Sequence, residues 1–196
     1  MNNPIFETAL EKYNFPTGGK LFKAEEIRDQ AFVVLRGRPD DADFVGVCRD
    51  KLGITLPQAL QLTEGKNSSY KTTCLWIAPD EFLAILPSNT KDAFLQAATE
   101  GLQGMFAAAV DNSGTYSYLN LSGDKLKEVL AKVTLYDTSP HSLPLNKVVG
   151  TVAGKSQIVL FRKDEHSVDV LVRFSFADYV WRLIARGAKE YHSDII

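Results

Sequence analysis

The sequence predicts an α+β protein made of two similar split β-α-β halves packed side by side. Short continuous apolar runs, which are typical of buried strands, alternate with apolar stripes at helical spacing. The order strand, helix, loop, strand, strand, helix occurs twice and indicates a weak internal repeat. With 196 residues and 45% hydrophobic content, the chain can bury a self-sufficient core. We expect an N-terminal arm over residues 1–25, a first half over 26–105 and a second half over 106–196.

The first half is predicted to open with a buried strand followed by an amphipathic helix. The strand covers Gln30–Arg36, whose apolar run ends before Gly37. Asp40 and Asp41 then supply side chains that can cap a helix. The stripe of that helix has i, i+4, i+8 spacing and consists of Phe44, Cys48 and Leu52.

A hairpin and a second helix complete the first half. The polar stretch Gln61–Lys71 is interpreted as a loop. Apolar runs over 73–77 and 82–86 flank Ala78-Pro79-Asp80-Glu81, whose proline and aspartate suit a type I turn. Ser88, Asn89 or Thr90 is then expected to cap a helix. The inward residues of that helix are Phe94, Leu95, Ala98 and Leu102.

The second half repeats this order. Tyr116–Leu121 is a predicted strand, and Ser122-Gly123-Asp124 is expected to start a helix with Leu126, Val129, Leu130 and Val133 inward. A second hairpin joins Gln157–Arg162 to Val168–Phe174. Ser175 is expected to cap the last helix, and its predicted stripe is Phe176, Val180, Leu183 and Ile184.

Composition excludes several classes of protein. The formal net charge of −2 argues against a broad nucleic-acid surface. No apolar run approaches the ~20 residues needed to cross a bilayer, and the polar, acidic N-terminus does not resemble a signal peptide. Two cysteines do not make a disulfide framework. We therefore expect a cytoplasmic protein without membrane or nucleic-acid partners.

No pattern in the chain predicts a catalytic, cofactor-binding or metal-binding residue. Gly150-Thr151-Val152-Ala153-Gly154-Lys155-Ser156 resembles a phosphate loop, but it has three residues between its glycines where four are needed. His141, His166 and His192 are too widely spaced for a metal motif. Cys48 and Cys74 lie in apolar segments and are interpreted as buried. Asp80 and Glu81 are interpreted as solvated turn charges.

Three aromatic residues leave two interpretations open. Trp76, Tyr179 and Trp181 can pack in the core, or they can anchor a partner. Trp181 lies off the predicted stripe of the last helix, which keeps a partner-facing position open for it. One alternative is therefore a homo-oligomeric module that uses Trp181, so self-association of the isolated chain stays open.

Several strings, taken together in order and spacing, resemble one protein family over about residues 30–191. The more specific ones contain Leu75-Trp76, Pro79-Asp80-Glu81 and Arg173-Phe174-Ser175-Phe176-Ala177-Asp178-Tyr179. Shorter ones are Phe32-Val33-Val34-Leu35-Arg36-Gly37, Val110-Asp111-Asn112-Ser113 and Leu121-Ser122-Gly123. Together they resemble the gamma subunit of heterotetrameric sarcosine oxidase, a family similar in fold to the folate-binding region of aminomethyltransferases.

This resemblance implies a subunit of a complex that oxidatively demethylates sarcosine to glycine and transfers the one-carbon unit to tetrahydrofolate. Its implied partners are large alpha and beta flavoprotein subunits and a small delta subunit. FAD, FMN, NAD, tetrahydrofolate and zinc are implied to be bound by those other subunits. For this chain the resemblance implies a role in assembly, with no cofactor or catalytic residue of its own.

The chain departs from the related patterns at two places. Val133-Thr134-Leu135-Tyr136-Asp137 replaces a Cys-Pro-Leu-Asp-like string, which leaves open which N-methyl amino acid the complex uses. Ser156-Gln157 stands where folate-using aminomethyltransferases carry an acidic pair, so no carboxylate is available there to hold a proton. A stand-alone folate-binding, aminomethyltransferase-like protein remains the alternative.

Overall fold

The computed structural model describes residues 7–67 and 69–191. The chain folds into two compact units, each with its own five-stranded sheet. We call them the β2–β6 unit and the β7–β10 unit. Among the described residues, the first comprises 28–67, 69–115 and 146–149, and the second comprises 7–27, 116–145 and 150–191.

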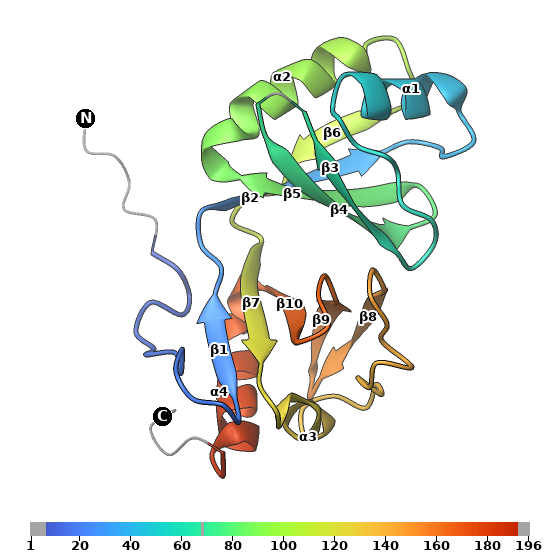
Figure 1. The fold of residues 1–196 in the computed structure, drawn as a ribbon. Coiled ribbons are helices and arrows are strands. Elements are labelled where there is room, and N and C mark those ends of the chain that lie inside the picture. The colour runs from blue at the N-terminus through green and yellow to red at the C-terminus, as the bar shows by residue number, and fades with distance from the viewer. Residues whose placement is uncertain (1–6, 68, 192–196) are drawn as a thin grey trace, which may run out of the picture. The chain divides into compact units, whose positions relative to one another are not determined.

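The β2–β6 unit contains two helices and a sheet of order β3-β4-β5-β2-β6 (Figure 1). Its apolar core includes Phe44, Cys48, Phe82 and Phe94, all fully buried. The elements in chain order are β2 (Gln30–Arg36), α1 (Ala42–Asp50), β3 (Leu62–Lys66), β4 (Lys71–Ala78), β5 (Glu81–Pro87), α2 (Lys91–Gly101) and β6 (Ala108–Asp111).

The β7–β10 unit has a sheet of order β1-β7-β10-β9-β8. Helix α4 packs against this sheet through a stripe that includes Val180, Trp181 and Ile184. The elements are β1 (Lys23–Glu26), β7 (Tyr116–Ser122), α3 (Leu126–Ala131), β8 (Val148–Ala153), β9 (Ser156–Phe161), β10 (Ser167–Arg173) and α4 (Ala177–Ala188). The first two residues of β8 fall in a segment assigned to the other unit.

The two sheets show the internal repeat at the level of topology. β7, β8, β9 and β10 occupy the same sheet positions as β2, β3, β4 and β5. The fifth strand differs in origin: β6 follows α2 in the chain, whereas β1 comes from the N-terminal segment. The predicted α+β class with two similar halves is thus confirmed. Of the predicted arm over residues 1–25, the last part enters β1, and Leu10 and Phe22 are fully buried.

The interpretation of Gln61–Lys71 as a loop was wrong, because Leu62–Lys66 forms the edge strand β3. Leu62 pairs with Leu75, and Lys66 pairs with Lys71. An edge strand exposes many side chains, so its composition is polar and does not show the apolar run of a central strand. Gly65 also lacks a side chain for a structural reason, since a Cβ there would lie 2.3 Å from the Gly53 carbonyl oxygen.

The predicted helix starts were only partly correct. Asp41 caps α1, and its Oδ1 accepts hydrogen bonds from the backbone N–H groups of Asp43 (3.0 Å) and Phe44 (3.4 Å). No side chain caps the other three helices. Single 3₁₀ turns, Ser88–Thr90 and Phe174–Phe176, lead into α2 and α4 in place of the caps expected at 88–90 and at Ser175. α3 begins at Leu126, later than Ser122-Gly123-Asp124.

Candidate functional site

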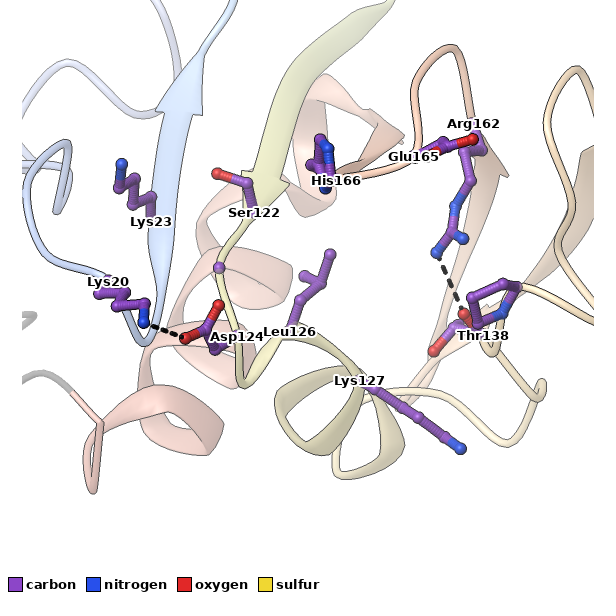
Figure 2. A pocket seen from close by; sticks show the side chains of 12 residues that line it. Lys20, Lys23, Ser122, Asp124, Leu126, Lys127, Thr138, Arg162, Glu165 and His166 are labelled. Carbon is purple, nitrogen blue, oxygen red and sulfur yellow. Dashed lines mark hydrogen bonds and ion pairs between the residues drawn. The ribbon is translucent and has the colours of Figure 1, made fainter.

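A hollow of about 500 Å³ opens on the β7–β10 unit, next to the turns that follow β7 and β9 (Figure 2). We call it the basic hollow. Gly123, with φ +118°, shapes one side, because a Cβ there would lie 2.5 Å from the Leu21 carbonyl oxygen. The following backbone N–H groups of Asp124 and Lys125 donate to the carbonyls of Lys20 (3.0 Å) and Leu21 (2.8 Å). These bonds hold the N-terminal segment beside the β7–α3 turn.

Positive charge predominates in the basic hollow. Its lining includes four permanent cations and two carboxylates. One carboxylate, Asp124, lies 3.6 Å from the Lys20 ammonium. The cations are Lys20, Lys23, Lys127 and Arg162, the second carboxylate is Glu165, and His166 is also part of the lining. Since the whole chain is slightly acidic, the hollow is a local concentration of positive charge.

Arg162 is the one buried cation of this lining, with 6% of its surface exposed. Its Nη2 donates to the Thr138 carbonyl at 3.3 Å, and its Nε has no hydrogen-bond partner. Burial lowers the pKa of the Arg162 guanidinium from its ordinary value, while the charge of Asp164 opposes that change. A buried, incompletely satisfied guanidinium is energetically costly unless something else pairs with it.

A second polar cluster lies on β7 and β10 of the same sheet. Asp169 is fully buried, and its Oδ1 accepts hydrogen bonds from the Tyr118 hydroxyl and from Asn120 Nδ2, each at 2.9 Å. Lys163 Nζ lies 3.7 Å from Asp169 Oδ2 and donates to the Tyr118 hydroxyl at 2.7 Å. Burial raises the pKa of Asp169, and the Lys163 charge and the two hydrogen bonds only partly oppose it. Asp169 Oδ2 is buried without a hydrogen-bond partner, so the carboxylate has no oxygen open to a ligand.

The raised pKa of Asp169 predicts a pH dependence of stability. The folded state favours the protonated acid, so the contribution of Asp169 is fully present below the ordinary value of 3.8 and is lost as pH rises through the raised pKa. We expect Asp169→Asn, which keeps the shape without the charge, to become more stable relative to the wild type as pH rises from 3.8. Urea unfolding between pH 4 and pH 8 measures this difference, and a difference that is flat with pH would contradict it. Asp164→Asn is the comparison of opposite sign, because the pKa of Asp164 is lowered and its stabilising contribution is present above 3.8.

Two large apolar side chains are almost completely exposed. Phe106, just before β6, is 98% exposed, and Leu135, in the loop after α3, is 97% exposed. Val110 on edge strand β6 is also exposed, and so is Val152 on β8. An isolated antiparallel bridge pairs Thr134 with Ala153, the chain neighbours of Leu135 and Val152 respectively. Each unit therefore carries one almost completely exposed apolar side chain, Phe106 in the β2–β6 unit and Leu135 in the β7–β10 unit.

The other residues examined in the sequence have ordinary structural roles. Cys48 and Cys74 are buried, and burial raises the pKa of the Cys48 thiol to about 12 and that of Cys74 further. His141 and His166 are exposed, and His192 lies outside the described residues. Within residues 7–67 and 69–191, no three His, Cys, Asp or Glu side chains gather as a metal site. Gly150–Ser156 runs through β8 and a tight turn into β9.

The charged turn lies at the surface, and the aromatic residues pack within the two units, Trp76 being partly buried against the core of the β2–β6 unit. Arg36 Nη2 lies 3.0 Å from Asp80, and Arg36 Nη1 lies 3.8 Å from Glu81, so an exposed and a partly buried carboxylate both pair with Arg36. Trp181 is fully buried, which decides in favour of a core position. The Tyr179 hydroxyl accepts a hydrogen bond from the Lys155 N–H at 3.2 Å. Phe176, predicted to be inward, is 47% exposed because it belongs to the 3₁₀ turn before α4.

No helix within the described ranges has the length and apolar character that a membrane span requires. The cations of the basic hollow were not predicted from the sequence, because Lys20 and Arg162 are far apart in the chain and form no motif. A signal for the buried cluster was present: Asp169 is a lone acid within the apolar run Val168–Val172.

Comparison with known proteins agrees with the fold and the sequence strings. The model of the sarcosine oxidase gamma subunit family matches residues 36–190. The sarcosine oxidase gamma subunit of Arthrobacter sp. is 31% identical over 182 residues, which cover 91% of this chain and 87% of that protein. The gamma subunit of Corynebacterium sp. (strain P-1) is 30% identical over 172 residues, covering 86% and 82%.

Solved structures share the fold. A chain of heterotetrameric sarcosine oxidase from Corynebacterium sp. U-96, in complex with pyrrole 2-carboxylate, superposes with a TM-score of 0.81 at 22% identity, covering 95% of this chain and 96% of that one. Aminomethyltransferase T of the glycine cleavage system from Bartonella henselae gives a TM-score of 0.65 at 12% identity, covering 84% of this chain and 45% of that one. On the sequence matches, this chain belongs to the sarcosine oxidase gamma subunit family.

Proposed function

We propose that this chain is a non-catalytic gamma-type subunit of a heterotetrameric, cytoplasmic sarcosine oxidase and that its role is assembly. The complex oxidatively demethylates sarcosine to glycine and transfers the one-carbon unit to tetrahydrofolate. The chain docks onto large alpha and beta flavoprotein subunits, beside a small delta subunit. FAD, FMN, NAD, tetrahydrofolate and zinc are held by those other subunits. Family membership over most of the chain supports this proposal.

The observation that carries the assembly role is the near-complete exposure of Phe106 and Leu135. Fully burying such a side chain is worth about 1.5–3 kcal/mol, so leaving it in water forgoes that stabilisation. Interfaces gain most of their affinity from a few apolar or aromatic anchors of this kind. One anchor on each unit provides two separate contacts for larger partners.

We expect the double variant Phe106→Ser/Leu135→Ser to lose its partners. The test co-expresses the chain with candidate alpha, beta and delta subunits and purifies the complex by a tag on this chain. Removing both apolar anchors is expected to reduce recovery of the other subunits at least about tenfold, since each anchor contributes about 1–2 kcal/mol to binding. Lys51→Ser, at an exposed position just after α1, is the control and keeps full recovery.

Other outcomes of the same preparation would reject the proposal. If active complex forms without this chain, the proposed assembly role is rejected. Sarcosine turnover, or tight calorimetric binding of tetrahydrofolate, by the purified chain alone would favour the stand-alone aminomethyltransferase-like alternative. A stable homo-oligomer at dilute concentration, measured by light scattering, would favour self-association through these exposed side chains.

A further inference from the structure

We propose that the basic hollow of the β7–β10 unit is a binding site for a small molecule that carries a doubly charged phosphate or a cluster of carboxylates. This site goes beyond the assembly role and does not depend on it. The proposal rests on the buried Arg162, on the net charge of the lining and on the size of the hollow, which are independent observations.

Arg162 lacks a counterion within the part of the chain that the structure describes. Its nearest acid in sequence, Asp164, is engaged in the β9–β10 turn, where it accepts hydrogen bonds from the His166 and Ser167 N–H groups and from the Ser167 hydroxyl. Burial of Asp164 raises its pKa, but those hydrogen bonds outweigh burial and hold it below the ordinary value. Asp164 therefore stays ionised within its turn and does not satisfy the Arg162 Nε.

The charges around the hollow match a dianion. Four permanent cations against two carboxylates leave a net charge of +2 in the lining. Lys20 and Lys23 lie on one side and Arg162 on the other, with Leu126 between them (Figure 2). Cations on opposite sides can contact separate oxygens of one ligand, and an arginine guanidinium suits phosphate and carboxylate geometry in particular.

The dimensions favour a small molecule. A hollow of about 500 Å³ falls within the range of roughly 300–1,000 Å³ that is typical of small-molecule sites. The lining also offers the apolar side chain of Leu126 and the hydroxyl of Ser122 to a non-ionic part of the ligand. The site thus combines an anion-binding wall with room for an organic group.

Isothermal titration calorimetry of the full chain at low ionic strength tests this site with inorganic phosphate, citrate and acetate as probes. We expect phosphate or citrate to bind at one site, acetate to bind at least about tenfold more weakly, and the affinity to fall as salt screens the lysines. Tighter binding of phosphate identifies a phosphate-bearing ligand, and tighter binding of citrate identifies a polycarboxylate.

Three variants assign the binding to the hollow. Arg162→Gln is expected to weaken the better anion at least about tenfold, because a charge-assisted bond inside a buried environment is lost. Lys23→Gln is expected to weaken it roughly twofold to fivefold, as for an exposed charge. Lys155→Gln removes an exposed lysine outside the lining and is expected to change nothing.

Each outcome of these titrations either supports or overturns the proposed anion site. If circular dichroism shows that Arg162→Gln does not fold, Lys23→Gln combined with Lys127→Gln decides in its place. Absence of binding by both phosphate and citrate overturns the proposal, as does an affinity that none of the hollow variants changes. Assembly of the oxidase complex is measured separately, so its failure leaves this result intact.

Discussion

Replacing Trp181 with alanine is expected to lower the free energy of unfolding by about 3–5 kcal/mol, the range for deleting a large aromatic side chain from a core. Trp181 is fully buried on α4. Its ring lies 4.5 Å from the Phe15 ring and 6.1 Å from the Tyr13 ring, measured between centroids. Both partners belong to the N-terminal segment, so the loss removes the apolar contact that holds this segment on the helix.

The polar contacts around Trp181 cannot compensate for that loss. The Tyr13 hydroxyl donates to Asp178 at 2.8 Å and accepts from Arg182 Nε at 2.9 Å, and Lys12 lies 2.7 Å from Asp178. These hydrogen bonds and this ion pair lie at the surface, and each contributes at most about 1 kcal/mol to the free energy of unfolding. We therefore expect the segment before β1 to gain rapid amide exchange in Trp181→Ala.

Urea unfolding followed by far-UV circular dichroism measures the effect, because tryptophan fluorescence would itself change with the substitution. Trp76→Ala is the matched control, since Trp76 is only partly buried at the margin of the other core. We expect a smaller loss there. A loss for Trp181→Ala of less than about 1 kcal/mol would show that the N-terminal segment does not depend on this ring.

Gly123→Ala is expected to cost about 1–3 kcal/mol more than Gly114→Ala, the price of backbone strain at a crowded position. Both glycines have positive φ, +118° and +81°, so both substitutions carry the left-handed penalty. Only at Gly123 would the new Cβ meet backbone, 2.5 Å from the Leu21 carbonyl oxygen, whereas nothing lies within 4 Å at Gly114. The difference between the two variants therefore isolates the steric contact.

Gly123→Ala is also expected to change the backbone that borders the basic hollow. To relieve the contact, the Lys20–Phe22 backbone must move away from the β7–α3 turn, and the hydrogen bonds from Asp124 and Lys125 lengthen. Thermal unfolding of Gly123→Ala and Gly114→Ala, each compared with the wild type, measures the loss of stability in the two variants. Equal destabilisation of the two variants would contradict the packing argument.

Central elements could be predicted from the sequence because their side chains carry a regular apolar pattern. Gln30–Arg36 matches β2 residue for residue, and Asp41 caps α1 as expected. Edge strands could not be predicted in the same way, since only one residue of β3 and none of β6 is buried, and their sequences are polar or short. The starts of α2 and α4 differ because a 3₁₀ turn precedes each helix and no side chain supplies a cap.

The position of Trp181 shows how one boundary error changes a functional interpretation. Counting the stripe of the last helix from Phe176 places Trp181 off that stripe. Counting from Ala177, the first residue of α4, places it at i+4, where it is buried. The basic hollow could not be predicted at all, because its cations meet only through the folded arrangement of β1, the β7–α3 turn and the end of β9.

The origin of the fifth strand in each sheet has a consequence for biosynthesis. The β2–β6 unit draws nearly all of its residues from one continuous stretch and can fold as soon as that stretch leaves the ribosome. β1 is synthesised before all of it, yet its hydrogen-bonding partner is β7, which is synthesised only afterwards. β1 therefore waits for its partner until the whole Arg28–Thr115 stretch has been synthesised, and its own sheet cannot close before β10 follows.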